Sequence, residues 1–189
     1  VFKRLLVYRK IVMDVFCDYR RYGINSRRER IVGWIKIPQL RFLFVFRLAS
    51  LYKNNILLKM LCRHYAIKYG YQINPGTRIG KGLYLGHWGS IVVNPLAVLG
   101  ENCNLAQGVT IDQTNRGNRQ GVPVIGSKVW IGTNAVVVGS IRIGNDVLIA
   151  PNSYVNCDVP NHSIVLGNPA RIIPRQNATE GYINHIIES

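Results

Sequence analysis

The sequence predicts a mainly β protein built as a solenoid, with an α-helical region at its N-terminal end. Three observations lead to this prediction. Aliphatic residues recur every six positions from Ile73 to Val155, apolar residues before residue 70 follow helical spacing, and most of the basic charge lies before residue 82. With 189 residues and 48% apolar side chains, the chain can form one domain with an appendage, or one slightly long domain.

The six-residue repeat is the strongest pattern in the chain. A period of six fits neither the 3.6-residue repeat of a helix nor the alternation of one long strand. It fits a short strand, a tight corner and another short strand, repeated so that inward aliphatic residues stack at about 4.8 Å from coil to coil. The repeat positions are Ile73, Ile79, Leu85, Val93, Leu99, Leu105, Ile111, Ile125, Ile131, Val137, Ile143, Ile149 and Val155.

Two insertions interrupt the repeat. Leu85 and Val93 are eight residues apart, which predicts a two-residue bulge around His87, Trp88 and Gly89. Ile111 and Ile125 are fourteen apart, and the polar, glycine-containing residues 113–121 between them predict a protruding loop. Functional residues tend to lie in such interruptions. From Pro174 onward, the sequence suggests a helical turn or two.

The N-terminal part carries nearly all of the excess charge. The chain has a net charge of +15; residues 1–81 hold 18 basic and three acidic side chains, whereas residues 82–189 hold six of each. Three helices are predicted here, over residues 1–20, 39–52 and 55–69, and the last of them should end near Gly70. Residues 20–30 are predicted to form a basic loop that contains a turn or cap signal.

This charge leaves several roles open. The helices could cap the solenoid with their basic side chains in solvent, or rest on an anionic membrane surface or anionic acceptor. Nucleic acid is disfavoured as a partner, because no nucleic-acid motif accompanies the charge.

Cysteine usage and hydropathy favour a cytoplasmic protein. Cys17, Cys62, Cys103 and Cys157 stand far apart without a CxxC motif, which predicts reduced thiols. No signal peptide or transmembrane helix is predicted, and the start at Val1 suggests that a few residues are missing or trimmed. The inner face of the membrane is the second expected location, through the basic region.

Two segments resemble the serine acetyltransferase-like members of the hexapeptide-repeat acyltransferases. The segment GLYLGHWGSIVVN (82–94) resembles that family's active-site segment, and LGNPARII (166–173) resembles the segment that ends its β-helix beside coenzyme A. With the repeat, the resemblance covers about residues 70–175. It implies a left-handed parallel β-helix of triangular section, with about four coils. The expected organisation is a basic α-helical N-terminal cap (1–70), a β-helix acyltransferase domain (71–173) and a tail (174–189).

The resemblance places the family's histidine on His87. Acetyl transfer to an alcohol needs a base, because a hydroxyl is a poor nucleophile at neutral pH. Imidazole can take that proton and pass it to the leaving thiolate, so we expect His87 to be the general base. Trp88, next to it, is a candidate for lining the acceptor site.

The resemblance also implies acetyl-CoA as co-substrate, a homotrimer, and no metal. Coenzyme A is expected along the later coils between neighbouring subunits, where the guanidinium of Arg171 would suit a phosphate. The expected coenzyme A contacts are Gly132, Thr133, Pro151, Asn156 and Arg171. The loop residues expected to close over the acceptor or pantetheine are Asn115, Arg116 and Arg119.

The acceptor is less well defined, because the sequence departs from the family pattern. The family's two carboxylates near the histidine correspond to Gly86 and Gln72 here, and its second histidine is absent from residues 120–123. These differences favour an O-acetyltransferase acting on a hydroxyl of a saccharide or cell-surface glycan precursor. The alternative is a serine O-acetyltransferase of cysteine biosynthesis.

Two other classes of protein can share a solenoid of this kind. A non-catalytic, membrane-docking trimeric scaffold would keep the fold without the chemistry, and would not bind coenzyme A. A zinc enzyme of the γ-carbonic anhydrase kind needs three histidine ligands, but only His87 of the four histidines lies within the repeat.

Overall fold

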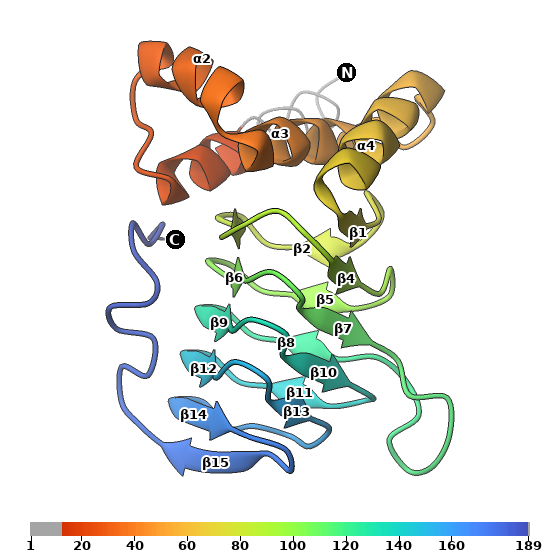
Figure 1. Cartoon of the computed structure of the whole chain (residues 1–189), viewed down its shortest axis with the longest axis vertical. Helices are drawn as coiled ribbons and strands as arrows, with labels where there is room; N and C mark the ends of the chain where they lie inside the picture. The colour runs from red at the N-terminus through yellow and green to blue at the C-terminus, as the bar shows by residue number, and fades with distance from the viewer. Residues whose placement is uncertain (1–12, 189) are drawn as a thin grey trace, which may run out of the picture.

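The computed structural model describes residues 13–188 and confirms a parallel β-helix beneath a layer of helices (Figure 1). Residues 13–21 are helical, so the first predicted helix lies partly outside the described residues. The helices that follow are α2 (Arg27–Lys36), α3 (Pro38–Leu51) and α4 (Ile56–Tyr69). The bounds of α3 and α4 agree with the predicted helices to within one residue.

The helix ends have local causes. The Ser26 hydroxyl accepts from the Glu29 amide, and the Glu29 carboxylate accepts from the Ser26 amide, forming a capping box. Helix α2 therefore begins inside the segment predicted as a basic loop, and that prediction was wrong beyond Ser26. Asn55 caps α4, and Gly70, with φ of 75°, ends it as predicted.

Three parallel sheets form the faces of the solenoid. Sheet A contains β1 (Tyr71–Ile73), β4 (Ile91–Val93), β7 (Thr110–Asp112), β10 (Val136–Val138) and β13 (Tyr154–Val155). Sheet B contains β2 (Arg78–Ile79), β5 (Val98–Leu99), β8 (Val124–Ile125) and β11 (Arg142–Ile143). Sheet C contains β3 (Tyr84–Leu85), β6 (Asn104–Leu105), β9 (Val129–Ile131), β12 (Val147–Ile149), β14 (Ser163–Leu166) and the antiparallel β15 (Arg171–Pro174).

The repeat residues form the core, because their register stacks them coil over coil. Ile73 pairs with Val93, and Val93 pairs with Ile111 in turn. Of the thirteen repeat aliphatics, twelve are at most 4% exposed, and Ile79 is partly buried. Three parallel faces built on a six-residue repeat agree with the left-handed β-helix that the family resemblance implies.

A buried ion pair joins the helices to the first coil. Arg47 on α3 and Asp18 form a salt bridge at 2.8 Å, with both side chains almost fully buried. Arg47 also donates to the carbonyls of Ile79 and Gly80, and Asp18 accepts from the Leu83 amide. The pair therefore satisfies backbone groups at the end of the solenoid, where no further coil can do so.

The C-terminal tail corrects a second prediction. After β15 it forms turns without a helix and runs back along the solenoid toward the helical end (Figure 1). Side chains of the coils bind its backbone: Asp146 accepts from the amides of Ala178 and Thr179, and Asn102 exchanges two hydrogen bonds with Ile187. These partners replace the hydrogen bonds that a helix would have supplied.

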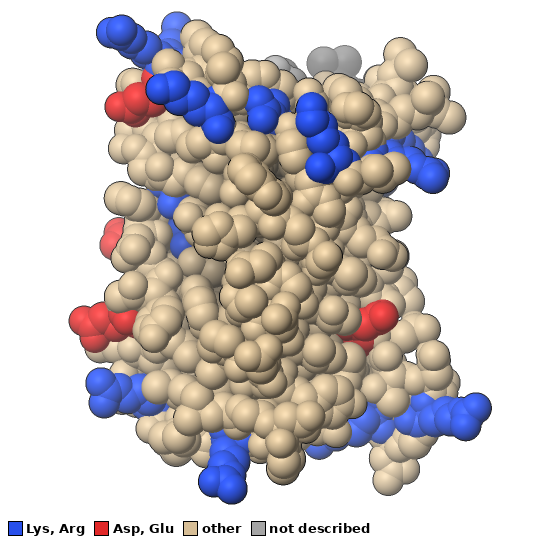
Figure 2. All heavy atoms as spheres, in the orientation of Figure 1, with Lys and Arg blue, Asp and Glu red and all other residues tan. Residues whose placement is uncertain are grey.

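Basic side chains line the helical end of the molecule, and others lie at the far end of the solenoid (Figure 2). The four cysteines are free, as predicted. Within residues 13–188, no helix is both long and apolar enough to cross a membrane.

Candidate active site

His87 lies in the turn by which the chain passes from sheet C to sheet A. We call this turn, repeated in each coil, the C–A corner. The His87 side chain is exposed, and its backbone carbonyl accepts a hydrogen bond from the hydroxyl of Tyr71 at 3.1 Å. Tyr71 is the first residue of β1 and is buried. The predicted bulge therefore exists, with its histidine facing solvent.

The end of α4 holds the other side of the bulge. The amide of Gly89 donates to the carbonyl of Tyr69 at 2.8 Å, and the amide of Ile91 donates to that of Gly70 at 3.0 Å. A Cβ atom on Gly70 would lie 2.9 Å from the Gly89 Cα atom. Gly89 itself has φ of 113°, a backbone conformation that residues with a Cβ atom rarely adopt. Close backbone contact thus sets the position of this segment.

Two further side chains from the helical end fix the residues before His87. The Tyr22 hydroxyl accepts from the Leu85 amide at 3.0 Å and donates to the Leu85 carbonyl at 2.9 Å. Gln39 on α3 donates to the Gly86 carbonyl at 3.3 Å. Sequence reasoning missed Tyr22, Gln39 and Tyr71, because each acts on a segment distant in the sequence and none follows a repeat.

The His87 ring itself has no hydrogen-bond partner among the described residues. Gly86 has no side chain, and Gln72 is an exposed residue of sheet A. The carboxylates that would orient such a ring in the resembling family are therefore absent from both positions. Trp88 is 62% exposed beside His87, so its indole is accessible to an acceptor.

Most of the predicted coenzyme A contacts share the C–A corner with His87, on later coils. Gly132 and Thr133 follow β9, and Pro151 follows β12. Arg171 pairs with Leu166 at the end of β14, which places it at the same corner of the last coil. Asn156 instead follows β13, at the corner between sheets A and B.

The exposure of these residues differs. Thr133 is half-buried, whereas Pro151 and Arg171 are exposed. Gly132 is buried, and a Cβ atom there would lie 2.7 Å from the Pro151 nitrogen. Coil stacking alone therefore requires glycine at 132, whether or not a ligand lies beside it.

The predicted loop leaves from a different corner. Residues 113–123 connect β7 of sheet A to β8 of sheet B, and Thr114 and Gly121 close this loop with two backbone hydrogen bonds of 3.0 Å. Arg119 donates to the Asp158 carboxylate at 2.8 Å, and Asn115 and Arg116 are exposed. The loop and His87 thus belong to different corners of one chain.

Trp130 of β9 makes an edge contact with Tyr182 of the tail, at 4.9 Å between ring centroids. Among residues 13–188, no group of three or more His, Cys, Asp or Glu is arranged to hold a metal ion.

Comparisons with known proteins agree with this architecture. The family model "Bacterial transferase hexapeptide (six repeats)" matches residues 123–157. The serine acetyltransferase of Synechococcus elongatus is 34% identical over 116 residues, which are 61% of this chain and 48% of that protein. The chain spans about half the length of curated relatives such as this one. It likewise covers 53% of a serine acetyltransferase of Staphylococcus aureus.

Solved structures give the same result. Soybean serine acetyltransferase complexed with serine has a TM-score of 0.75 at 27% identity, over 87% of this chain and 70% of that chain. Serine acetyltransferase from Brucella abortus strain S19 in complex with coenzyme A has a TM-score of 0.71 at 29% identity, over 89% and 68%. The repeat, the three parallel sheets and these similarities show that the chain resembles the hexapeptide-repeat, serine acetyltransferase-like acyltransferases in both sequence and fold.

Proposed function

We propose that the chain transfers an acetyl group from acetyl-CoA to a hydroxyl group, with His87 as the general base. The observation that carries this proposal is the exposed His87 on a bulge that Tyr71, Gly70 and Tyr69 hold in place. His87 takes the proton of the acceptor hydroxyl while the hydroxyl oxygen attacks the thioester carbonyl carbon. The carbon–sulfur bond then breaks, and the proton passes to the leaving thiolate of coenzyme A.

The C–A corner is the proposed donor site. Thr133, Pro151 and Arg171 follow one another along this corner below His87, and Arg171 offers a guanidinium to a phosphate group. The similar serine acetyltransferase from Brucella abortus is known in complex with coenzyme A, which supports coenzyme A as the group that carries the acetyl donor. When bound, acetyl-CoA supplies the activated acetyl group.

A homotrimer would complete the site. The loop residues Asn115, Arg116 and Arg119, and also Asn156, lie at the A–B corner, away from His87 within one chain. We propose that a neighbouring chain brings this corner to the C–A corner, so that two chains enclose the acceptor and the pantetheine. Trp88 would then line the acceptor side.

Serine is the first candidate acceptor. The similar proteins named above are serine acetyltransferases, and none of them supports the saccharide or glycan acceptor that the sequence favoured. A different small hydroxyl compound remains the second candidate, because Gln72 and Gly86 leave His87 and the acceptor without the two carboxylates of the resembling family.

The remaining expectations stay predictions. They are the cytoplasmic location, the contact of the basic helical end with an anionic membrane surface, and the non-catalytic scaffold as the alternative of another class. Absence of coenzyme A binding would favour the scaffold over the enzyme.

The test is thiol release from acetyl-CoA, with L-serine and a panel of other small hydroxyl compounds as acceptors. His87→Ala should lower turnover by about a hundred- to ten-thousand-fold, the usual contribution of a general base. His64→Ala, at an exposed histidine of α4, is the matched control and should retain activity. Full activity of His87→Ala would overturn the assignment, and turnover with serine would settle which acceptor candidate holds.

A further inference from the structure

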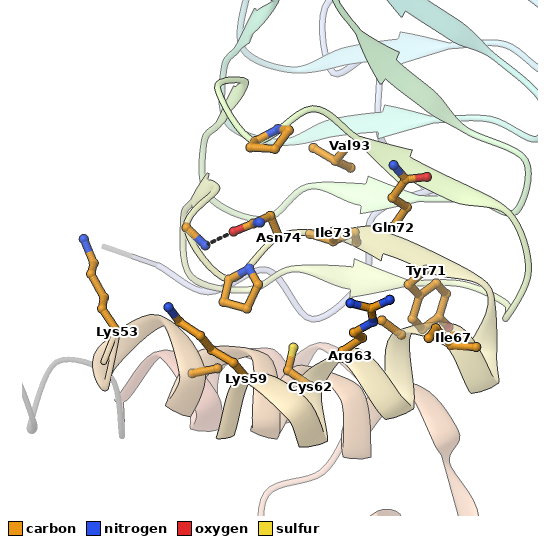
Figure 3. A pocket seen from close by; sticks show the side chains of 15 residues that line it. Lys53, Lys59, Cys62, Arg63, Ile67, Tyr71, Gln72, Ile73, Asn74 and Val93 are labelled. Carbon is orange, nitrogen blue, oxygen red and sulfur yellow. Dashed lines mark hydrogen bonds between the residues drawn. The ribbon is translucent and has the colours of Figure 1, made fainter. Parts of the chain in front are cut away.

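A groove separates α4 from the first coils of sheet A, away from the C–A corner. Its volume is about 570 Å³. Lys53, Lys59 and Arg63 line it from the helical side, and Gln72 and Asn74 line it from β1 and the turn after it (Figure 3). His87 and the residues proposed to bind coenzyme A do not line this groove.

The groove is lined by basic side chains that no acidic side chain neutralises. Its three basic side chains are exposed, and none forms an ion pair with any residue in the range 13–188. No Asp or Glu lines it. Positive charges along the wall of a groove raise the electrostatic potential inside it and attract anions, since low-dielectric walls focus the field.

Two other cations of the helical end, Arg47 and Arg21, make hydrogen bonds that serve the fold. Arg47 is bound to Asp18 and to two backbone carbonyls, and Arg21 donates to the Gly82 carbonyl and to the Asn104 side chain. Lys53, Lys59 and Arg63 have no such hydrogen bonds. Hydrogen bonds within the fold therefore do not account for the position of these three side chains along the groove.

The rest of the lining is neutral, partly polar and partly apolar. The side-chain oxygen of Asn74 accepts a hydrogen bond from the Gly76 amide at 2.7 Å, which leaves the side-chain NH₂ group of Asn74 free to donate to a ligand. Pro75, Pro95 and Ile67 add apolar surface. Burial raises the pKa of the Cys62 thiol to about 11, so this lining residue contributes no negative charge near neutral pH.

We propose that this groove binds a phosphate monoester or diester that carries a short apolar or hydroxylated part. Lys59 and Arg63 would contact the phosphate oxygens, with Lys53 at the outer end, and the Gln72 and Asn74 amides would contact the remainder. Phosphate suits this set, because guanidinium and ammonium groups form strong charge-assisted hydrogen bonds with its oxygens. A soluble phosphate ester and a phospholipid headgroup share this chemistry.

The test compares two variants with the same change in charge. Lys59→Gln/Arg63→Gln removes two cations from the groove, whereas Arg28→Gln/Lys36→Gln removes two exposed cations from α2. Calorimetry with glycerol 3-phosphate measures the soluble ester. Flotation with vesicles of equimolar phosphatidylglycerol and phosphatidylcholine, against pure phosphatidylcholine, measures the headgroup. Thermal unfolding checks that both variants fold.

We expect saturable binding of at least one probe, weakened about 10- to 100-fold in the groove variant and little changed in the α2 variant. Binding of the ester identifies a soluble ligand, and binding of the anionic vesicles alone identifies a headgroup. Equal weakening in both variants would mean diffuse charge attraction and would overturn the proposal, as would no binding of either probe. Because acetyl transfer is not measured, these outcomes leave the proposed enzymatic function untouched.

Discussion

The hydroxyl of Tyr71 donates a hydrogen bond to the backbone carbonyl of His87 over 3.1 Å, although sixteen residues separate them in the chain. Tyr71 begins the first strand and packs against Phe42 of α3, at 4.9 Å between ring centroids. The helical layer therefore reaches the backbone of the proposed base through the buried side chain of Tyr71. The position of His87 depends on how the helices sit on the first coil.

Tyr71→Phe should lower kcat for acetyl transfer several-fold while leaving the KM for acetyl-CoA nearly unchanged. The variant keeps the ring and removes only the bond that positions the His87 backbone, which costs about 1 kcal/mol of unfolding free energy. Steady-state kinetics and urea denaturation measure the two effects. Tyr69→Phe, which removes the hydroxyl that accepts from Arg41, is the control. An unchanged kcat in Tyr71→Phe would show that this bond does not position the base.

Gly70→Ala should destabilise the protein by about 1–3 kcal/mol, because the residue has φ of 75° and its new Cβ atom would meet the backbone of Gly89 and Ser90 at 2.9 Å. Gly181→Ala is a close control, since Gly181 has φ of 78° but open space around it. Chemical denaturation of both variants separates the steric contact from the backbone strain. Equal losses of stability would mean that the contact with the His87 bulge contributes nothing.

Arg171→Gln should raise the KM for acetyl-CoA about tenfold without changing the acceptor KM, if its guanidinium contacts a phosphate of the donor. Arg175→Gln removes an exposed arginine four residues later and should have little effect. Initial-rate kinetics at varied acetyl-CoA concentration provide the measurement. Parallel increases in both variants would assign the effect to net charge.

The attachment of the tail should weaken in acid. Burial alone would raise the pKa of Asp146, but hydrogen bonds from Thr179, His162 and Ala178 to its carboxylate outweigh this effect and lower it. A carboxyl with a lowered pKa contributes stability above its unfolded value of about 3.9, and this contribution is lost as the pH falls through the lower, folded value.

Trp130 fluorescence can follow this release, because its indole contacts Tyr182 of the tail. The wild-type signal should change as the pH falls below about 4, whereas Asp146→Asn should show a changed signal already at neutral pH and little further response. Identical pH profiles for the two proteins would exclude Asp146 as the group that holds the tail.

The amino-acid sequence by itself determined the solenoid, its core and two of its helices. A six-residue repeat imposes a coil of short strands, and its inward aliphatics have no alternative to burial, so the core and the solenoid follow from local pattern. The eight-residue interval predicted the exposed bulge at His87, and the fourteen-residue interval predicted the loop. Apolar residues at helical spacing predicted α3 and α4, and Gly70 predicted the end of α4.

Only the tertiary structure decided which loops, corners and side chains lie next to one another. That Thr133, Pro151 and Arg171 share a corner with His87, while Arg119 does not, depends on the sheet from which each turn leaves. The capping box of α2 corresponds to the cap signal that the sequence shows in residues 20–30, although the prediction there was a loop and not the start of a helix. The path of the tail, the hydrogen bond from Tyr71 and the groove under α4 were not readable, because they arise where side chains of distant segments meet. A periodic pattern records which residues are buried, but not which buried or polar groups become neighbours once the coils and helices pack.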